Sequence, residues 1–311
     1  MAIMESTRIR RYQDDLYLVS LPVPIAGFQG FVGAWVLTGD QKVIVDPGPS
    51  VTIPALLESL AELDAGSPDL ILLTHIHIDH AGGIGDLAEA FPRATVVCHP
   101  RATQHLIDPE RLWQGSLQTL GDIARAYGPI RPLPAGQVLS SDQLRAPHIE
   151  CIETPGHAVH HVSFLVDDLL FAGEVGGVHL PMDEVTVYLR PATPPRFFLE
   201  THLESIDRVL ERMPRRICYG HIGLRHDAQE MLKAYRDQLL RWRQMIHPFF
   251  DGVQGAENLQ TMQACSQYLL DNDPLLAGFV HLAPDVQQRE RTFMLNSIKG
   301  YWGSFTQAAE R

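Results

Sequence analysis

The chain has 311 residues, of which 45% are hydrophobic, and carries a formal net charge of −12 at pH 7. This hydrophobic content is enough for a sizeable core and excludes a disordered chain. The negative charge repels phosphate backbones and argues against nucleic acid as a partner, although a local basic patch stays compatible with it.

Membrane and secretion signals are missing from the sequence. No apolar run comes near the ~18 residues of a membrane-spanning helix, and the N-terminal residues 5–8 are polar. We therefore expect a cytoplasmic protein with no membrane partner. The cysteines lie far apart without a C-x-x-C pair, which predicts buried reduced thiols; they are Cys98, Cys151, Cys218 and Cys265.

The first predicted strands of the chain end at an aspartate, Asp46. Residues 9–21 alternate as a strand does, and 31–37 with 43–45 predict a hairpin. The hairpin ends at Asp46-Pro47-Gly48, which by itself is an ordinary turn. Leucines at helical spacing predict a helix over 52–64, and the apolar run 70–73 predicts a buried strand.

The stretch that follows this strand is the most informative in the chain. Within six residues, 75–80, it places three imidazoles and a carboxylate. Alternate side chains of an extended segment share a face, so His75 and His77 project together. A turn at Asp79 and His80 changes the direction in which the side chains of Asp79 and His80 point. Such ligands suit zinc or iron, and two adjacent sets can hold two ions. The alternative is a histidine-rich surface loop.

Further strand ends carry similar side chains. After helices and a Pro-rich loop, a strand over 149–152 ends in Thr154-Pro155-Gly156-His157, and a hairpin over 163–172 ends in Gly173-Glu174. A helix over 199–210 precedes a short strand that delivers His221. His99 and His105 are interpreted as surface or packing histidines.

The segment 175–195 is punctuated by Gly and Pro and predicts a loop that contacts substrate. It holds His179, Asp183, Tyr188 and Arg190. Tyr188 or His179 is placed to reach a developing oxyanion, and Arg190 to hold a carboxylate or phosphate. A structural role is the simpler interpretation of each.

From Asp227 onward the pattern becomes helical. Asp227 and Glu230 resemble a capping box, and apolar stripes predict three helices within 226–311, packed on the core as an extension. Its basic side chains are most simply solvated or capping residues: His247, His281, Arg289 and Arg291.

The histidine stretch resembles the H-x-H-x-D-H signature of the metallo-β-lactamase superfamily, and the other motifs match over roughly residues 9–225. The resemblance implies an α+β fold, a four-layer αββα sandwich over 1–225, with 226–311 as the helical C-terminal extension. It also implies two divalent metal ions, with zinc as the first choice of metal and iron or manganese as alternatives. The implied ligands are His75, His77 and His157 for one ion and Asp79, His80 and His221 for the other, with Glu174 between them.

Neighbouring residues have supporting roles in the resembled family. Asp46 holds the ligand loop by hydrogen bonds, and His161 is a supporting residue. His160 replaces a small residue and is interpreted as a surface or pocket-edge side chain. The family normally has Asp at the position of Glu174, so an alternative is a Glu that faces solvent and leaves a single ion.

The implied activity is hydrolysis of a small-molecule ester, lactone, thioester or phosphodiester by a metal-activated hydroxide, with Asp79 and Tyr188 as candidate catalytic residues. The motifs look most like the lactonase and glyoxalase-II-like branches. The alternatives are a mononuclear iron oxygenase of the persulfide dioxygenase type and a non-catalytic metal-binding sensor. We expect a small-molecule substrate as partner, and a homodimer is left open.

Overall fold

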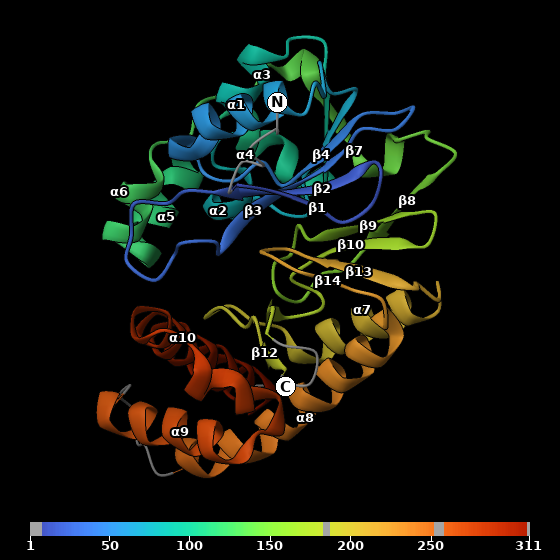
Figure 1. Cartoon of the computed structure of the whole chain (residues 1–311). Coiled ribbons are helices and arrows are strands. Elements are labelled where there is room, and N and C mark those ends of the chain that lie inside the picture. Colours follow the sequence, from blue (N-terminus) through green and yellow to red (C-terminus); the bar gives the residue numbers. More distant parts are fainter. Residues whose placement is uncertain (1–7, 183–186, 252–257, 310–311) are drawn as a thin grey trace.

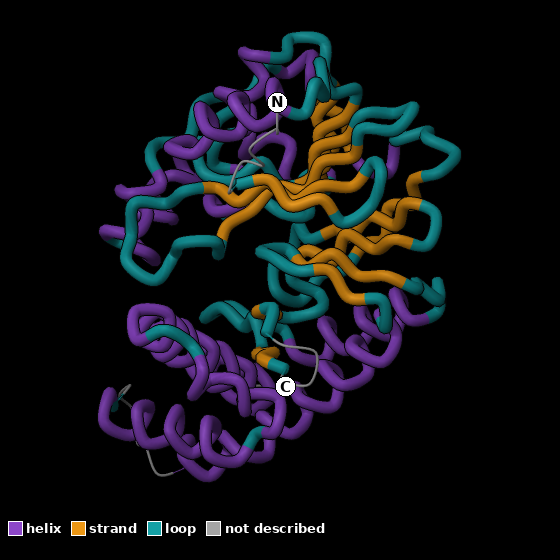
Figure 2. Tube along the Cα trace, in the orientation of Figure 1, coloured by secondary structure: helices purple, strands orange, loops and turns teal. Residues whose placement is uncertain are grey.

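The computed structural model describes residues 8–182, 187–251 and 258–309. Two β-sheets lie face to face in the middle, and helices cover the outer face of each sheet (Figures 1 and 2). This is the four-layer αββα sandwich that the sequence predicts, with helices at the C-terminal end of the chain.

The first sheet is built from the N-terminal half and has the order β1-β2-β3-β4-β5-β6-β7. Neighbours are antiparallel from β1 to β4 and parallel from β4 to β7. The strands are β1 (Ile9–Arg11), β2 (Leu16–Leu21), β3 (Val32–Leu37), β4 (Val43–Val45), β5 (Leu70–Leu72), β6 (Thr95–Cys98) and β7 (Val138–Ser140).

The second sheet has the order β14-β13-β10-β9-β8. Its pairs are antiparallel except β10 with β13, which run parallel. The strands are β8 (Ile149–Glu153), β9 (Val162–Val166), β10 (Leu169–Gly173), β13 (Arg216–Tyr219) and β14 (Leu224–Arg225).

The period-2 alternation of the strands builds two apolar layers. In β5, Leu70 and Leu72 belong to the cluster between the sheets, whereas Ile71 belongs to the cluster that contains the helices. The indole Nε1 of Trp35 in the first sheet donates to Tyr219 O in the second, at 2.9 Å. Both faces of each sheet are therefore covered, which explains why the central strands are continuous apolar runs.

Ten α-helices are assigned within the described residues, and α1, α3 and α4 lie beyond the first sheet, with α7 and α8 beyond the second (Figure 1). Those of the first half are α1 (Ile53–Glu62), α2 (Ile78–Ala81), α3 (Ile84–Ala90), α4 (Thr103–Ile107), α5 (Glu110–Leu120) and α6 (Asp122–Tyr127). The others are α7 (Leu199–Leu210), α8 (Ala228–Asp251), α9 (Leu259–Asn272) and α10 (Pro284–Ala309), with the 3-10 helix η5 (Pro274–His281) between the last two.

The C-terminal helices share the hydrophobic core of the rest of the chain. One cluster of buried side chains runs from Val19 to Trp302 and includes residues of α8, α9 and α10. The division into domains at residue 225 stays a prediction. Among the described helices, none is both long and apolar enough to cross a membrane.

One prediction about secondary structure is wrong in part, and one strand is not predicted. The segment 175–195, predicted as a loop, contains β11 (Val178–Leu180) and β12 (Tyr188–Arg190), which form an antiparallel two-stranded sheet. The sequence pattern also does not predict strand β7. These strands have three residues each, too few for an alternating pattern to stand out. Asp183 lies outside the described residues.

Candidate metal centre

Loops from both sheets meet at one edge of the sandwich. His75, His77, Asp79 and His80 all follow β5, the last two within α2, and the other candidate ligands follow β8, β10 and β13. Backbone hydrogen bonds tie these loops together: Val162 N–H donates to Thr74 O at 2.8 Å, and Gly220 N–H donates to Gly173 O at 3.0 Å. The predicted ligands, separated by up to 146 positions in the sequence, are thereby brought into one place.

The first group consists of His75, His77 and His157, whose ligand atoms lie within 4.8 Å of one another. His157 Nδ1–H donates to the backbone oxygen of Ala192 at 2.8 Å, so its Nε2 is an acceptor, and it forms a hydrogen bond of 2.9 Å with His77 Nδ1. His75 Nδ1 is 3.0 Å from Thr74 Oγ1, and its Nε2 is buried without a hydrogen-bond partner. The ring nitrogens of three imidazoles thus converge.

The second group consists of Asp79, His80 and His221, again within 4.8 Å. Glu174 borders it: its Oε1 is 3.0 Å from His221 Nε2 and 3.6 Å from His80 Nε2. Its other oxygen, Oε2, is buried and has no hydrogen-bond partner. A glutamate at this position therefore does not face solvent, which answers one alternative left open by the sequence.

Asp46 holds the loop of the first group and a histidine of the second group by hydrogen bonds. Its Oδ1 accepts the Thr74 backbone N–H at 2.8 Å, and its Oδ2 accepts the Thr74 hydroxyl at 2.6 Å and lies 3.1 Å from His80 Nδ1. The residue adopts a positive φ of 52°, a conformation that Asp tolerates better than most residues. The predicted hydrogen-bonding role of Asp46 is confirmed.

His161 supports Glu174 through the main chain. Its Nε2 accepts the Glu174 N–H at 2.9 Å, so the proton must be on Nδ1, which lies 2.7 Å from Thr154 Oγ1. Gly173 makes this contact possible, because a Cβ at this residue (φ 57°) would lie 2.5 Å from His161 Nε2. The supporting role predicted for His161 is confirmed.

Burial and neighbouring charges shift the pKa of the histidines in the first group and the pKa of His80 in opposite directions. Burial lowers the pKa of His75 and His77 well below the usual imidazole value, and nearby imidazoles lower it further. Burial also disfavours protonated His80, but Asp79, Asp46 and Glu174 outweigh it and raise the pKa of His80 well above its usual value. Burial would raise the pKa of Glu174, yet His221 and His80 hold it well below its usual range.

This arrangement fits divalent cations. The first group presents neutral nitrogens, the form that binds metal, and the second combines imidazoles with carboxylates. The buried free atoms His75 Nε2 and Glu174 Oε2 would be costly without a cation or another partner. The structure therefore brings together every ligand that the resemblance implies.

The side chains predicted to contact substrate are engaged elsewhere. The Tyr188 hydroxyl is buried and donates to Glu290 of α10 at 2.9 Å, and Arg190 Nε donates to the same carboxylate oxygen. His179 stacks on Tyr219 with ring centroids 4.8 Å apart. The structure gives Tyr188 a place in a buried network, and its catalytic role stays a prediction.

One interpretation of the C-terminal extension is wrong. Arg289, expected to be solvated, is only 6% exposed and lies over the ring of Phe31, with Cζ 3.8 Å from the ring centroid. The sequence analysis missed Phe31 as well, whose ring stacks on His221 at 4.0 Å. No local motif marks either residue, since their contact joins segments far apart in the chain.

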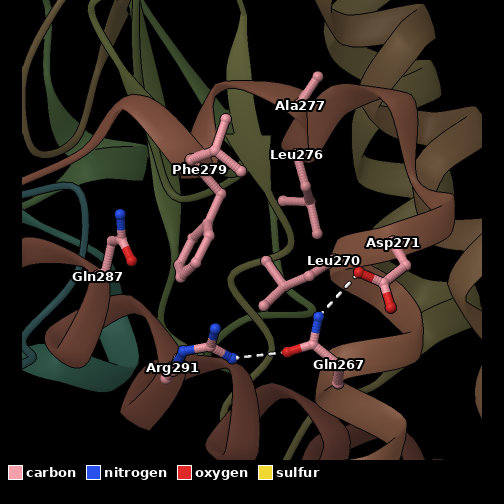
Figure 3. Close-up of a pocket in the computed structure, with 9 residues that line it drawn as sticks. Gln267, Leu270, Asp271, Leu276, Ala277, Phe279, Gln287 and Arg291 are labelled. Carbon is pink, nitrogen blue, oxygen red and sulfur yellow. Dashed lines mark hydrogen bonds between the residues drawn. The ribbon is translucent and has the colours of Figure 1, made fainter. Parts of the chain in front are cut away.

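A separate cleft of about 390 Å³ lies on the helical extension, between α9, η5 and α10 (Figure 3). Its polar groups bond to one another: Arg291 donates to Gln267 at 3.1 Å, and Gln267 donates to Asp271 at 2.8 Å. None of the candidate ligands lines it. The candidate centre is therefore defined by the converging histidines and not by this cleft.

Comparisons with known proteins agree with this geometry. The model of the metallo-beta-lactamase superfamily matches residues 27–221. A metallo-beta-lactamase fold-containing protein of Sulfurisphaera tokodaii is 30% identical over 219 residues, which cover 67% of this chain and 78% of that protein. A hydroxyacylglutathione hydrolase of Salmonella paratyphi A is 34% identical over 147 residues, and this chain spans only 45% of its length.

Solved structures show the same fold. A metallo-beta-lactamase family protein of Thermus thermophilus aligns with a TM-score of 0.62 at 21% identity, over 96% of this chain and 95% of that one. At this identity the likeness concerns the fold alone. The match of the family model and the Sulfurisphaera relative establish the family itself: the chain belongs to the metallo-β-lactamase superfamily.

Proposed function

We propose that the chain is a metal-dependent hydrolase of a small-molecule ester, lactone, thioester or phosphodiester, with thioesters as the first class to test. The observation that carries this proposal is the pair of adjacent ligand groups, the second of which is bordered by Glu174 next to His80 and His221. The similarity to a hydroxyacylglutathione hydrolase supports the choice of thioesters.

We infer that two divalent ions, zinc first, are held by the two groups. When bound, they supply a hydroxide nucleophile near neutral pH and polarise the carbonyl or phosphoryl oxygen of the substrate. The residues that would hold them are His75, His77 and His157 for one ion and Asp79, His80 and His221 for the other, with Glu174 between them.

The side chains of this centre divide the remaining tasks. Hydrogen bonds that His157 and His80 donate to Ala192 O and Asp46 keep these rings in fixed orientations, so little reorganisation is needed when substrate binds. The Asp79 side chain is 22% exposed, against 4% for Glu174 and 3% for Asp46. Its carboxylate is therefore the acidic group of the centre best placed to exchange a proton with the solvent side.

The proposal is tested by metal analysis combined with a panel of thioesters, lactones, esters and phosphodiesters. We expect turnover of at least one class, loss of turnover on removal of metal by a chelator, and recovery with Zn²⁺. Asp79→Asn should reduce turnover more than it reduces metal content. Bound metal without turnover of any class would favour a sensor, and oxygen consumption without hydrolysis would favour the oxygenase. A small-molecule partner, a homodimer and a cytoplasmic location stay predictions.

A further inference from the structure

His221 differs from three of the four other candidate histidine ligands in what holds its ring. His75, His80 and His157 each have Nδ1 within 3.1 Å of an oxygen, from Thr74, Asp46 and Ala192 respectively. Nε2 of His221 lies toward Glu174 and Asp79, but its Nδ1 is buried with no hydrogen-bond partner among the described residues. On its Nδ1 side, the side away from the candidate metal, no hydrogen bond among the described residues therefore orients this ring, although Nε2 lies 3.0 Å from Glu174 Oε1.

An aromatic ring packs against the His221 imidazole instead. The phenyl ring of Phe31 lies 4.0 Å from the His221 ring, centroid to centroid, with planes 22° apart. The guanidinium carbon of Arg289 lies 3.8 Å from the centroid of the same phenyl ring. The Phe31 ring thus contacts both the guanidinium of Arg289 and the imidazole of His221.

Arg289 is itself fixed at several points. Its Nε donates to Glu290 Oε1 at 2.9 Å, and its Nη1 donates to the backbone oxygen of Gly27. The other oxygen of Glu290 accepts from Tyr188 and Arg190 of β12. A chain of contacts thus leads from β12 through α10 to Phe31 and ends at a candidate metal ligand, and every member is buried.

We propose that Phe31 and Arg289 are positioning residues for His221. Through Arg289, helix α10 then helps to orient a ligand of the second group. The phenyl ring prevents rotation of the imidazole about its Cβ–Cγ bond, and the guanidinium holds the phenyl ring by attraction to its negative face. Orienting partners of metal ligands commonly change metal affinity by ~10–100-fold. This inference rests on the metal binding proposed above.

The experiment is a competition titration of the full-length, metal-free protein with Zn²⁺ and a chelating indicator. We expect two binding steps in the wild type. In Phe31→Leu one step should weaken by ~10–100-fold while the other stays unchanged. Arg289→Lys should weaken the same step by less, because Phe31 remains. The Co²⁺-loaded protein should show a changed absorption spectrum for one ion in Phe31→Leu.

Phe28→Leu is the matched control. Phe28 lies in the same loop and also neighbours Phe31 and Arg289, at 5.7 Å from the Phe31 ring and 5.7 Å from the guanidinium carbon, but it has no ring contact with His221 among those found. It therefore tests whether direct contact with the imidazole is what matters. It should lower the stability of the metal-free protein as Phe31→Leu does, with both binding steps intact.

The outcomes separate this inference from the function proposed above. Two steps unchanged in Phe31→Leu, or equal weakening in Phe28→Leu and Phe31→Leu, would overturn the positioning role alone. A wild type that binds no ion would overturn the proposed function, and the positioning role with it.

Discussion

Hydrogen bonds to Thr74 and Asp46 determine that Nδ1 of His75 and of His80 carries a proton. A carboxylate only accepts hydrogen bonds, so the Thr74 hydroxyl donates to Asp46 and must accept from His75 Nδ1–H. The same carboxylate accepts from His80 Nδ1–H. His75 is thereby held with Nε2 deprotonated before any cation arrives, whereas the neighbouring carboxylates raise the pKa of His80, whose Nε2 must lose its proton when it binds metal.

His77→Ala tests the first group directly. It removes a converging nitrogen, so metal content should fall. The melting temperature in Zn²⁺ should fall too, because a ligand present at ~1,000 times its Kd contributes about 4 kcal/mol to stability. The control is His105→Ala, since His105 is exposed. Equal metal content and melting temperature in the two variants would contradict the assignment of His77.

Glu174 is the residue with the greatest bearing on mechanism. If its carboxylate contacts both ions, Glu174→Asp should keep two ions and measurable turnover, because a shorter carboxylate can still coordinate. Glu174→Ala should lose the weaker ion first. Metal content and turnover are measured for all three proteins. Wild-type values of both in Glu174→Ala would leave this glutamate with no role in binding.

At the scale of single residues, the sequence predicts ligands better than their supports. The histidines could be identified because His75, His77 and His80 lie in one short motif that follows a strand. Phe31 and Arg289 could not, since an aromatic loop residue and a helical arginine have many ordinary uses. Their role depends on a contact between positions that only the tertiary fold brings together.

At the scale of elements, length decides what could be predicted. Helices such as α7 and α8 span several turns, so their apolar stripes stand out. Strands β11 and β12 have three residues each, and their pairing is apparent only from their register, with Val178 opposite Arg190. The small sheet nevertheless matters, because it presents Tyr188 and Arg190 to α10.

A buried carboxylate joins the helices of the extension. Asp273, at the start of η5, accepts from Gln238 and Trp242 of α8 at 2.7 and 2.6 Å, and from Arg241 at 2.8 Å. Asp273→Ala would leave buried donors without a partner. We expect a loss of about 3 kcal/mol in the free energy of unfolding, the lower end of the usual range because Arg241 is one-third exposed.

Denaturant titration measures this loss. The control, Asp271→Ala, changes an exposed carboxylate two residues away and should alter stability by less than ~0.5 kcal/mol. Metal content should stay unchanged in both. A similar stability for Asp273→Ala and Asp271→Ala would show that the buried network does not hold the extension.

At the scale of the whole molecule, buried neutral histidines make stability depend on pH. Burial lowers the pKa of His179 to about 4, whereas an unfolded histidine titrates near ~6.5. Between these values the unfolded state binds more protons, so stability rises with pH and is lost as pH falls below ~6.5. One such histidine changes the slope by up to ~1.4 kcal/mol per pH unit.

His179→Phe keeps a ring against Tyr219 and removes the titration. In the metal-free protein, we expect the variant to lose less stability than the wild type between pH 6.5 and about pH 4. Denaturant unfolding at several pH values measures both slopes. Parallel slopes would mean that His179 has the same proton affinity in the folded and unfolded states.

The stack of Arg289, Phe31 and His221 also sets an order of events during synthesis. Gly27 and Arg289 are 262 positions apart, whereas the first histidine group is complete once Ala192 has been made. About 100 further residues precede Arg289, which is roughly 5–20 s of translation at ~5–20 residues per second. All ligands of the second group are made by residue 221, so we expect a nascent chain stalled in this interval to bind the second ion more weakly than the finished chain does.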